Sequence, residues 1–143
     1  MTVVIGIATA SAFFVLAVIH IMFAAVHRSK WMAAALPHVG DRPAFVPSKP
    51  ATLAVALFLG GCALLVLGRI GLLDAIAPDW IFQTGTALLA MLLVARAVGD
   101  FQLVGFFKRI RGSTFARLDT WLYSPLCAVL GASCAIVAFP PGS

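Results

Sequence analysis

The chain has 143 residues, of which 62% are hydrophobic and only 10% are charged. A soluble domain has about 45 to 50% apolar and about 25% charged residues. The composition of this chain therefore excludes a soluble domain, because too little polar surface remains to cover a globule in water. The net charge of +5 comes from basic loops that suit lipid headgroups, and it gives no case for a nucleic-acid partner.

Four apolar stretches are each long enough to cross a bilayer as a helix. A helix rises about 1.5 Å per residue, so about 18 to 24 residues cover the roughly 30 Å hydrocarbon layer. Lipid offers the backbone no hydrogen-bond partner, and none of the stretches alternates like a barrel strand. The sequence therefore predicts an all-α membrane protein, a four-transmembrane-helix bundle that forms a single domain over residues 1–143. The predicted helices are 3–26, 51–68, 80–98 and 121–139.

The first stretch favours a retained helix over a cleaved signal peptide, because it lacks a basic start and is longer than a signal peptide's apolar region. The loop that follows it contains Pro37, Pro43, Pro47 and Pro50. Prolines exclude a long helix. We therefore expect this loop to run extended along the membrane surface.

The loop before the fourth helix has a different pattern. Over residues 101–115, aromatic and aliphatic side chains interleave with basic ones. Such a segment is typical of chain that rests in the lipid headgroup layer. The sequence therefore predicts an interfacial amphipathic segment here, with Lys108, Arg109 and Arg111 as a membrane-surface anchor.

The basic residues also predict the orientation of the chain. Eight lie in the first and third loops, whereas the second loop has only Arg69 beside two aspartates. Short loops rich in Lys and Arg remain in the cytoplasm. We therefore expect two basic cytoplasmic loops, with both termini outside. The eight residues are Arg28, Lys30, Arg42, Lys49, Lys108, Arg109, Arg111 and Arg117.

The spacing of the cysteines and histidines does not favour a cofactor site. Cys127 and Cys134 lie about 10 Å apart along one predicted helix, too far for a disulfide. Cys62 stands alone, so the cysteines are expected to be packing residues. His20 and His27 share one helix face and cannot ligate a haem from both sides. No metal site and no cofactor are predicted.

Five polar side chains are expected at one depth, near the cytoplasmic ends of the helices. An ionisable group close to hydrocarbon is costly without a partner. The sequence therefore predicts a polar cluster at the inner leaflet as the candidate binding site. Its members are His20, Arg96, Asp100, Asp119 and Tyr123.

Each member of this cluster also has a structural interpretation. Arg96 and Asp100 are four residues apart and can pair within one helix. Asp119 can be the N-cap of the fourth helix, and His20 can donate to a neighbouring helix. The cluster is therefore either a pocket that binds a ligand or handles protons, or an ionic lock between helices.

Part of the chain resembles a known family. The resemblance is carried by His20, by Leu36-Pro37 and by the run RAVGDFQLVGFFKRIRGSTFARLDTWLYSPLC from Arg96 to Cys127. These features are similar to a family of small four-helix bacterial membrane proteins known only as domain of unknown function 3995. The resemblance implies the fold and a multi-pass location in the bacterial inner membrane, and it implies no activity.

Three kinds of function remain open. The preferred one is a binding or accessory membrane protein, whose cluster locks helices or holds a lipid-like or small-molecule ligand. The second is a membrane enzyme acting on a lipid-like or small amphiphilic substrate at the cytoplasmic face, with His20 as general base and Arg96 holding an anionic group. The third is a small transporter working as a homodimer, although no carboxylate lies at mid-membrane to couple protons. Besides the lipid bilayer, the expected partners are therefore such a ligand or a second copy of the chain.

Overall fold

Four long helical segments make up most of the structure, a computed structural model that describes residues 1–26, 36, 38–39, 42–43, 46–100, 102, 104–109 and 113–141. The first three are α1 (Thr2–Ala25), α3 (Lys49–Arg69) and α4 (Asp79–Val98). The fourth runs without a break through α5 (Thr114–Leu118), the π-helical turn η1 (Asp119–Tyr123) and α6 (Ser124–Ala138). All four segments are long and apolar enough to cross a membrane.

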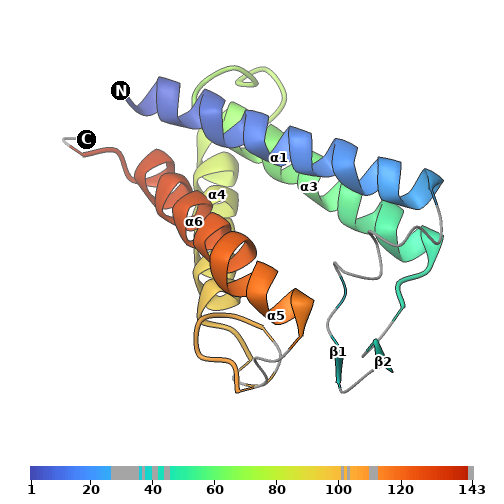
Figure 1. The fold of residues 1–143 in the computed structure, drawn as a ribbon. Helices are drawn as coiled ribbons and strands as arrows, with labels where there is room; N and C mark the ends of the chain where they lie inside the picture. The colour runs from blue at the N-terminus through green and yellow to red at the C-terminus, as the bar shows by residue number, and fades with distance from the viewer. Residues whose placement is uncertain are drawn as a thin grey trace.

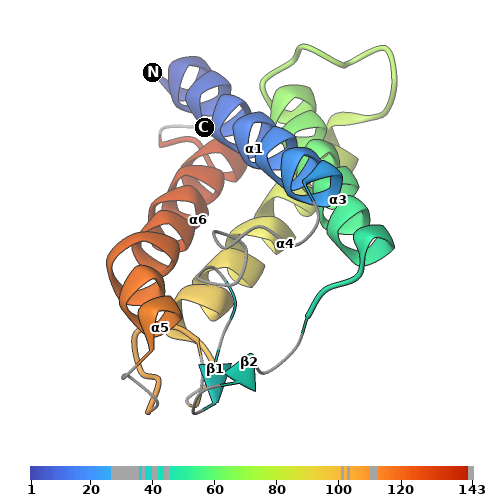
Figure 2. The same cartoon turned by 45° about the vertical axis from the view of Figure 1, so that its right-hand side comes forward.

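The helices form two pairs. In Figures 1 and 2, α1 lies along α3, and α4 lies along α6. The pairs meet near the two chain termini and diverge toward the opposite end, where two short strands form a hairpin. These are β1 (His38–Val39) and β2 (Arg42–Pro43), paired antiparallel. A groove lined by residues of α1, α3 and the start of α6 lies at this end.

The core lies where the two pairs meet, and small side chains let the helices approach there. Val66, Cys134 and Phe13 are fully buried within it. Gly68 allows α3 to approach α4 closely, since a Cβ at this position would collide with the ring of Phe82. Cys62 is also buried and carries a free thiol. Cys62 and Cys134 are therefore the packing residues that the sequence predicts.

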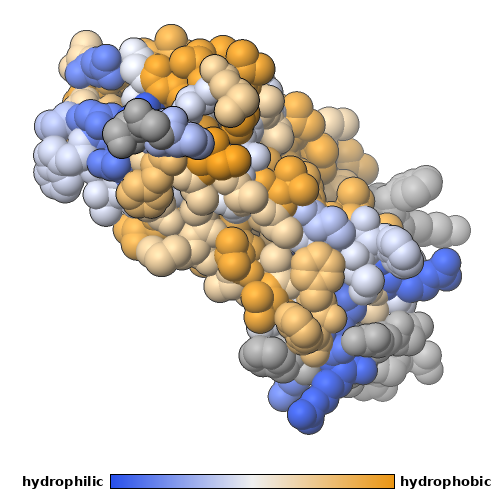
Figure 3. Space-filling model, turned by 90° about the vertical axis from the view of Figure 1, so that its left-hand side faces the viewer, coloured by the Kyte–Doolittle hydropathy of each residue, from blue (hydrophilic) through white to orange (hydrophobic). Residues whose placement is uncertain are grey.

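Hydrophobic side chains cover the outside of the bundle. Figure 3 shows them across the middle of one face, with hydrophilic side chains at its two ends. Leu57, Val4 and Phe14 are among the exposed large apolar residues. An exposed apolar surface of this extent marks contact with a membrane or another protein. With four helices long enough to span, the structure is that of a candidate membrane protein.

The fourth helical segment begins at Thr114, seven residues before its predicted start at residue 121. Ser113 is the reason, because its Oγ accepts a hydrogen bond from the Ala116 backbone N–H (3.1 Å) and caps the helix. The prediction that Asp119 is the N-cap is therefore wrong. Asp119 lies inside the helical segment, in η1. The other three helices match their predicted bounds within two residues.

Some predictions fall outside the described residues. They concern the extended path of most of the first basic loop, including Arg28 and Lys30, and the surface position of Arg111. Pro50 is described and lies in the first turn of α3, where a missing N–H costs no hydrogen bond.

Candidate functional site

Asp119 is the centre of a buried ionic cluster. Its side chain is 0% exposed, and its two oxygens pair with different cations. Oδ1 lies 2.7 Å from Arg96 Nη2, and Oδ2 lies 2.9 Å from Lys108 Nζ. Oδ2 also accepts from the Gly105 backbone N–H (2.7 Å) and from Ser124 Oγ (3.3 Å). We call these five residues the Asp119 cluster.

Lys108 lies in this cluster rather than at the membrane surface. Its side chain is 1% exposed. Besides Asp119, its Nζ donates to the Gly105 carbonyl (3.0 Å) and to Thr120 Oγ1 (2.6 Å). Three acceptors, one of them a carboxylate, match the three N–H groups of the ammonium. The prediction of Lys108 as a surface anchor is therefore corrected, whereas Arg109 is exposed and its anchoring role stays a prediction.

The loop after α4 brings Lys108 and Gly105 to Asp119. Gly99 and Gly105 have φ angles of +94° and +90°, a region that favours glycine. Their backbones touch, since a Cβ on Gly99 would collide with the Val104 carbonyl oxygen. The Phe106 N–H donates to the Ala97 carbonyl (2.9 Å) at the end of α4. The loop thus folds back on the helix and presents its donors to the carboxylate.

Asp100 organises this loop. Its Oδ1 accepts from the backbone N–H groups of Gln102 (2.9 Å) and Val104 (3.0 Å). Side chains of aspartate often stabilise turns in this way. Arg96 makes its carboxylate contact with Asp119, across 23 residues of chain, instead of with Asp100 four residues away.

The π-helical turn places Asp119 within the helical segment. The Ser124 N–H donates to the Asp119 carbonyl, one residue further along than in an α-helix. Thr120 Oγ1 in turn donates to the Ala116 carbonyl (3.0 Å). Single π turns occur often at functional sites. Here the turn holds a carboxylate, a hydroxyl that accepts from Lys108 and, at its end, Tyr123.

His20 and Tyr123 line a separate groove, which we call the wedge pocket. It has a volume of about 740 Å³ and lies between α1, α3 and the start of α6. This is the end where the helix pairs diverge (Figure 2). Its described lining consists of Leu16, Ile19, His20, Phe23, Leu36, Pro47, Ala51, Thr52, Val55, Leu122, Tyr123 and Leu126.

Both polar rings of the wedge pocket are held by neighbours. His20 Nδ1 lies 2.7 Å from the Leu16 carbonyl oxygen, and its ring meets Phe23 edge-on at 6.3 Å between centroids. The Tyr123 ring packs against Phe115, with centroids 6.0 Å apart. The five residues of the predicted polar cluster therefore separate into three groups: Arg96 with Asp119, His20 with Tyr123, and Asp100 in the loop.

Several residues of the Asp119 cluster were missed from the sequence. Ser124 resembles a helix start, and Lys108 follows the pattern of an interfacial segment. The position of Asp119 could have indicated Lys108 as a partner, because a carboxylate so close to an apolar helix requires nearby cations. The glycines at 99 and 105 give a second signal, since they permit a tight return of the loop.

A second polar cluster lies near the chain termini. Arg69 Nη1 pairs with Asp79 Oδ1 (3.1 Å), and its Nη2 donates to the Ala138 carbonyl (3.2 Å). Gln83 Nε2 donates to the same carbonyl (3.2 Å). Carbonyls at a helix C-terminus lack intrahelical partners. This cluster therefore ties the end of α6 to α3 and α4.

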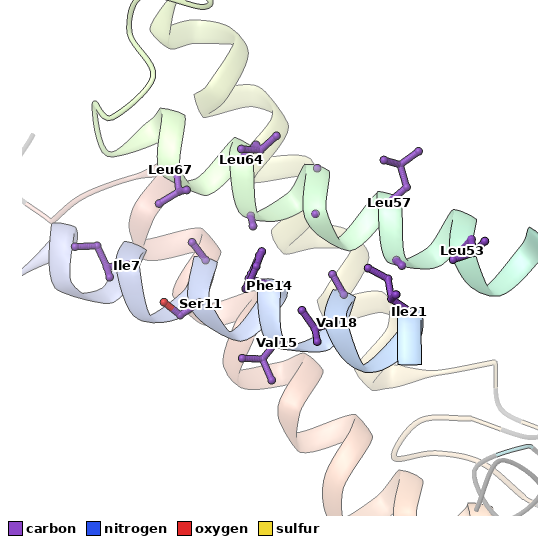
Figure 4. A pocket seen from close by; sticks show the side chains of 16 residues that line it. Ile7, Ser11, Phe14, Val15, Val18, Ile21, Leu53, Leu57, Leu64 and Leu67 are labelled. Carbon is purple, nitrogen blue, oxygen red and sulfur yellow. The ribbon is translucent and has the colours of Figure 1, made fainter. Parts of the chain in front are cut away.

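A groove larger than the wedge pocket lies between α1 and α3 (Figure 4) and has a volume of about 1070 Å³. Ser11 is its only hydroxyl-bearing residue, and its other described lining residues are apolar or glycine. Phe14 and Leu64 both line it and are largely exposed. Such a groove suits hydrocarbon chains of any lipid, and it offers few groups that would select one.

Four helices able to span a membrane, with salt bridges buried around Asp119, define a candidate multi-pass membrane protein. The family of proteins of unknown function DUF3995 matches residues 13–134, and the chain belongs to that family. The predicted resemblance is thus confirmed. None of the curated proteins and none of the solved structures matches the chain.

Proposed function

We propose that this protein is a multi-pass protein of the bacterial inner membrane that binds one amphiphilic, lipid-like molecule in the wedge pocket. The observation that carries the proposal is the lining of this pocket, which combines apolar walls with His20 and Tyr123. Ligand sites are typically apolar clefts of about 300 to 1000 Å³ with a few polar groups that fix orientation. The wedge pocket fits this description, unlike the apolar groove between α1 and α3.

In this proposal the Asp119 cluster is an ionic lock that supports one wall of the pocket. Asp119 precedes Tyr123 by four residues in the same helical segment. Its contacts with Arg96 and Lys108 join that segment to α4 and to the loop after it. Removing one partner of a buried ion pair leaves an uncompensated charge, so the cluster strongly favours one arrangement. Tyr123 is thereby held facing α1.

The proposed orientation places the wedge pocket at the cytoplasmic leaflet. Lys49 and Arg109 belong to the two basic loops, which lie at the end of the bundle where the helix pairs diverge. The positive-inside rule assigns such loops to the cytoplasm. The ligand would therefore enter from the inner leaflet, with both chain termini outside, and the whole chain would act as one membrane domain.

The lining of the pocket favours binding over catalysis. His20 is the one residue in its described lining that can act as a general base at neutral pH. Its Nδ1 contacts a backbone carbonyl rather than a carboxylate. None of the described lining residues is an acid, a lysine or an arginine that could stabilise a charged transition state.

Native mass spectrometry of protein released from detergent micelles tests the proposal. Val55→Trp places an indole in the wedge pocket, and Leu64→Trp places one in the α1–α3 groove as a matched control on the same helix. We expect the wild type and Leu64→Trp to retain one amphiphile per chain and Val55→Trp to lose it. Equal occupancy in all three proteins, or an empty wild type, would contradict the proposal.

A further inference from the structure

We infer that the wedge pocket selects an uncharged amphiphile whose headgroup carries a hydroxyl group, and that this hydroxyl donates to His20 Nε2. The inference rests on the proposed function and specifies its ligand. It follows from the tautomer of His20, from the position of Tyr123 and from the charges in the described lining of the pocket.

The contact of His20 with Leu16 fixes which ring nitrogen carries a proton. A carbonyl oxygen only accepts, so Nδ1, at 2.7 Å from the Leu16 oxygen, must be the donor. In the neutral imidazole the other nitrogen, Nε2, then has a lone pair and accepts. The edge-on contact with Phe23 holds the ring plane. The neutral ring of His20 therefore presents an acceptor, to which a ligand hydroxyl can donate.

Tyr123 supplies the complementary group from the other helix pair. His20 belongs to α1, whereas Tyr123 ends the π-helical turn before α6, and both line the wedge pocket. A phenol hydroxyl both donates and accepts. In the inferred complex the ligand hydroxyl donates to His20 and accepts from Tyr123. Such a headgroup bridges the two helix pairs where they diverge.

The same lining disfavours an anionic headgroup. None of the described residues around the pocket is a lysine or an arginine. Arg96 and Lys108 are paired with Asp119, and Lys49, between the lining residues Pro47 and Ala51, is exposed and lies outside the lining. The hydroxyl of Thr52 donates to the Ser48 carbonyl (3.1 Å). A phosphate in the pocket would lose hydration without meeting a cation in the described lining, a cost that an uncharged hydroxyl avoids.

Photolabelling with three matched probes tests the inference. The probes are a long-chain alcohol with a diazirine near its hydroxyl, the methyl ether of that alcohol, and its phosphate monoester. The full chain is placed in nanodiscs of phosphatidylethanolamine and phosphatidylglycerol, and labelled peptides are quantified by mass spectrometry. The peptide around Phe14, in the α1–α3 groove, reports nonspecific labelling by lipid-soluble probes.

We expect the alcohol to label the segments around His20 and Tyr123 about two to ten times more strongly than the ether, the range expected for one hydrogen bond. The phosphate should label them no better than the ether does. In His20→Phe, which keeps an aromatic ring without the acceptor, the alcohol and the ether should label equally. In His20→Gln, whose amide oxygen can accept, part of the preference should return.

The two ways of failing are distinguishable. Preferred labelling of the wedge pocket by the phosphate, or equal labelling by alcohol and ether in the wild type, would overturn the inference while leaving the pocket a binding site. Labelling around His20 and Tyr123 that stays at the level of the Phe14 peptide with all three probes would overturn both the inference and the proposed function.

Discussion

At the scale of single residues, Asp119 joins four polar groups: Arg96, Lys108, the Gly105 N–H and Ser124. One carboxylate faces Arg96 and Lys108, so the three side chains together carry a positive charge. Arg96 is 32% exposed, and its Nη1 is buried without a hydrogen-bond partner among the described residues. Removing Asp119 would leave two cations without their counter-charge in an apolar bundle.

Asp119→Asn therefore tests the ionic lock. The amide keeps the size of the carboxylate but removes its charge, and breaking a buried pair in this way costs about 3 to 5 kcal/mol. The free energy of unfolding is measured by SDS titration in mixed micelles. Asp79→Asn is the matched control, since Asp79 is 62% exposed in its pair with Arg69 and exposed pairs contribute less than about 1 kcal/mol. Equal losses in the two variants would contradict the lock.

At the scale of elements, the return of the loop after α4 depends on two glycines. Gly105 has a φ of +90°, and a Cβ there would collide with the Val98 carbonyl oxygen. The loop carries both Lys108 and the Gly105 N–H to Asp119. The conformation of the loop and the ionic lock are therefore coupled.

In Gly105→Ala, backbone strain alone should lower the free energy of unfolding by about 1 to 3 kcal/mol. The steric collision adds to this loss, so we expect a larger total decrease. The change is read by the same SDS titration. Gly60→Ala is the control, because it lies inside α3 with no atom within 4 Å of the added Cβ and should be neutral or stabilise by up to about 1 kcal/mol. A Gly105→Ala protein as stable as the wild type would show that the loop does not need this return.

The helices were predictable from the sequence because length and apolar composition alone determine which stretches can span a bilayer. The start of the fourth was not, because Ser113 and Asp119 are both good caps and the choice depends on whether the helix continues from Thr114 into the π turn that begins at Asp119. The contact between Arg96 and Asp119 was foreseeable from their expected closeness along the helices. The separation of His20 from these two residues was not, because it depends on the rotation of each helix and on how the pairs diverge.

At the scale of the whole molecule, the two helix pairs meet at the end with the termini and diverge at the end with the basic loops (Figure 1). The contacts of Arg69 with the Ala138 carbonyl and with Asp79 join the pairs at the first end. The Asp119 cluster acts within one pair at the other end. At this second end the wedge pocket offers a place where a ligand can lie between the pairs.

The proposed orientation predicts that both termini face the periplasm. Alkaline phosphatase fused after residue 143 should be active in bacteria, since it folds only outside the cytoplasm, and green fluorescent protein at the same position should remain dark. The same pair of fusions after residue 109, in the second basic loop, should give the opposite result. A fluorescent C-terminal fusion would contradict the orientation while leaving the wedge pocket to be tested by itself.

The most direct measurement of the central claim is nuclear magnetic resonance of the protein in nanodiscs of perdeuterated lipid. Only His and Tyr rings are protonated in the protein, and one equivalent of protonated long-chain alcohol is added. Tyr123 is the only tyrosine in the chain, so its signals are unambiguous, and His20→Phe identifies those of His20. We expect cross-relaxation from both rings to the carbon-bound protons of the alcohol next to its hydroxyl. Rings that show no cross-relaxation with the alcohol would contradict the account.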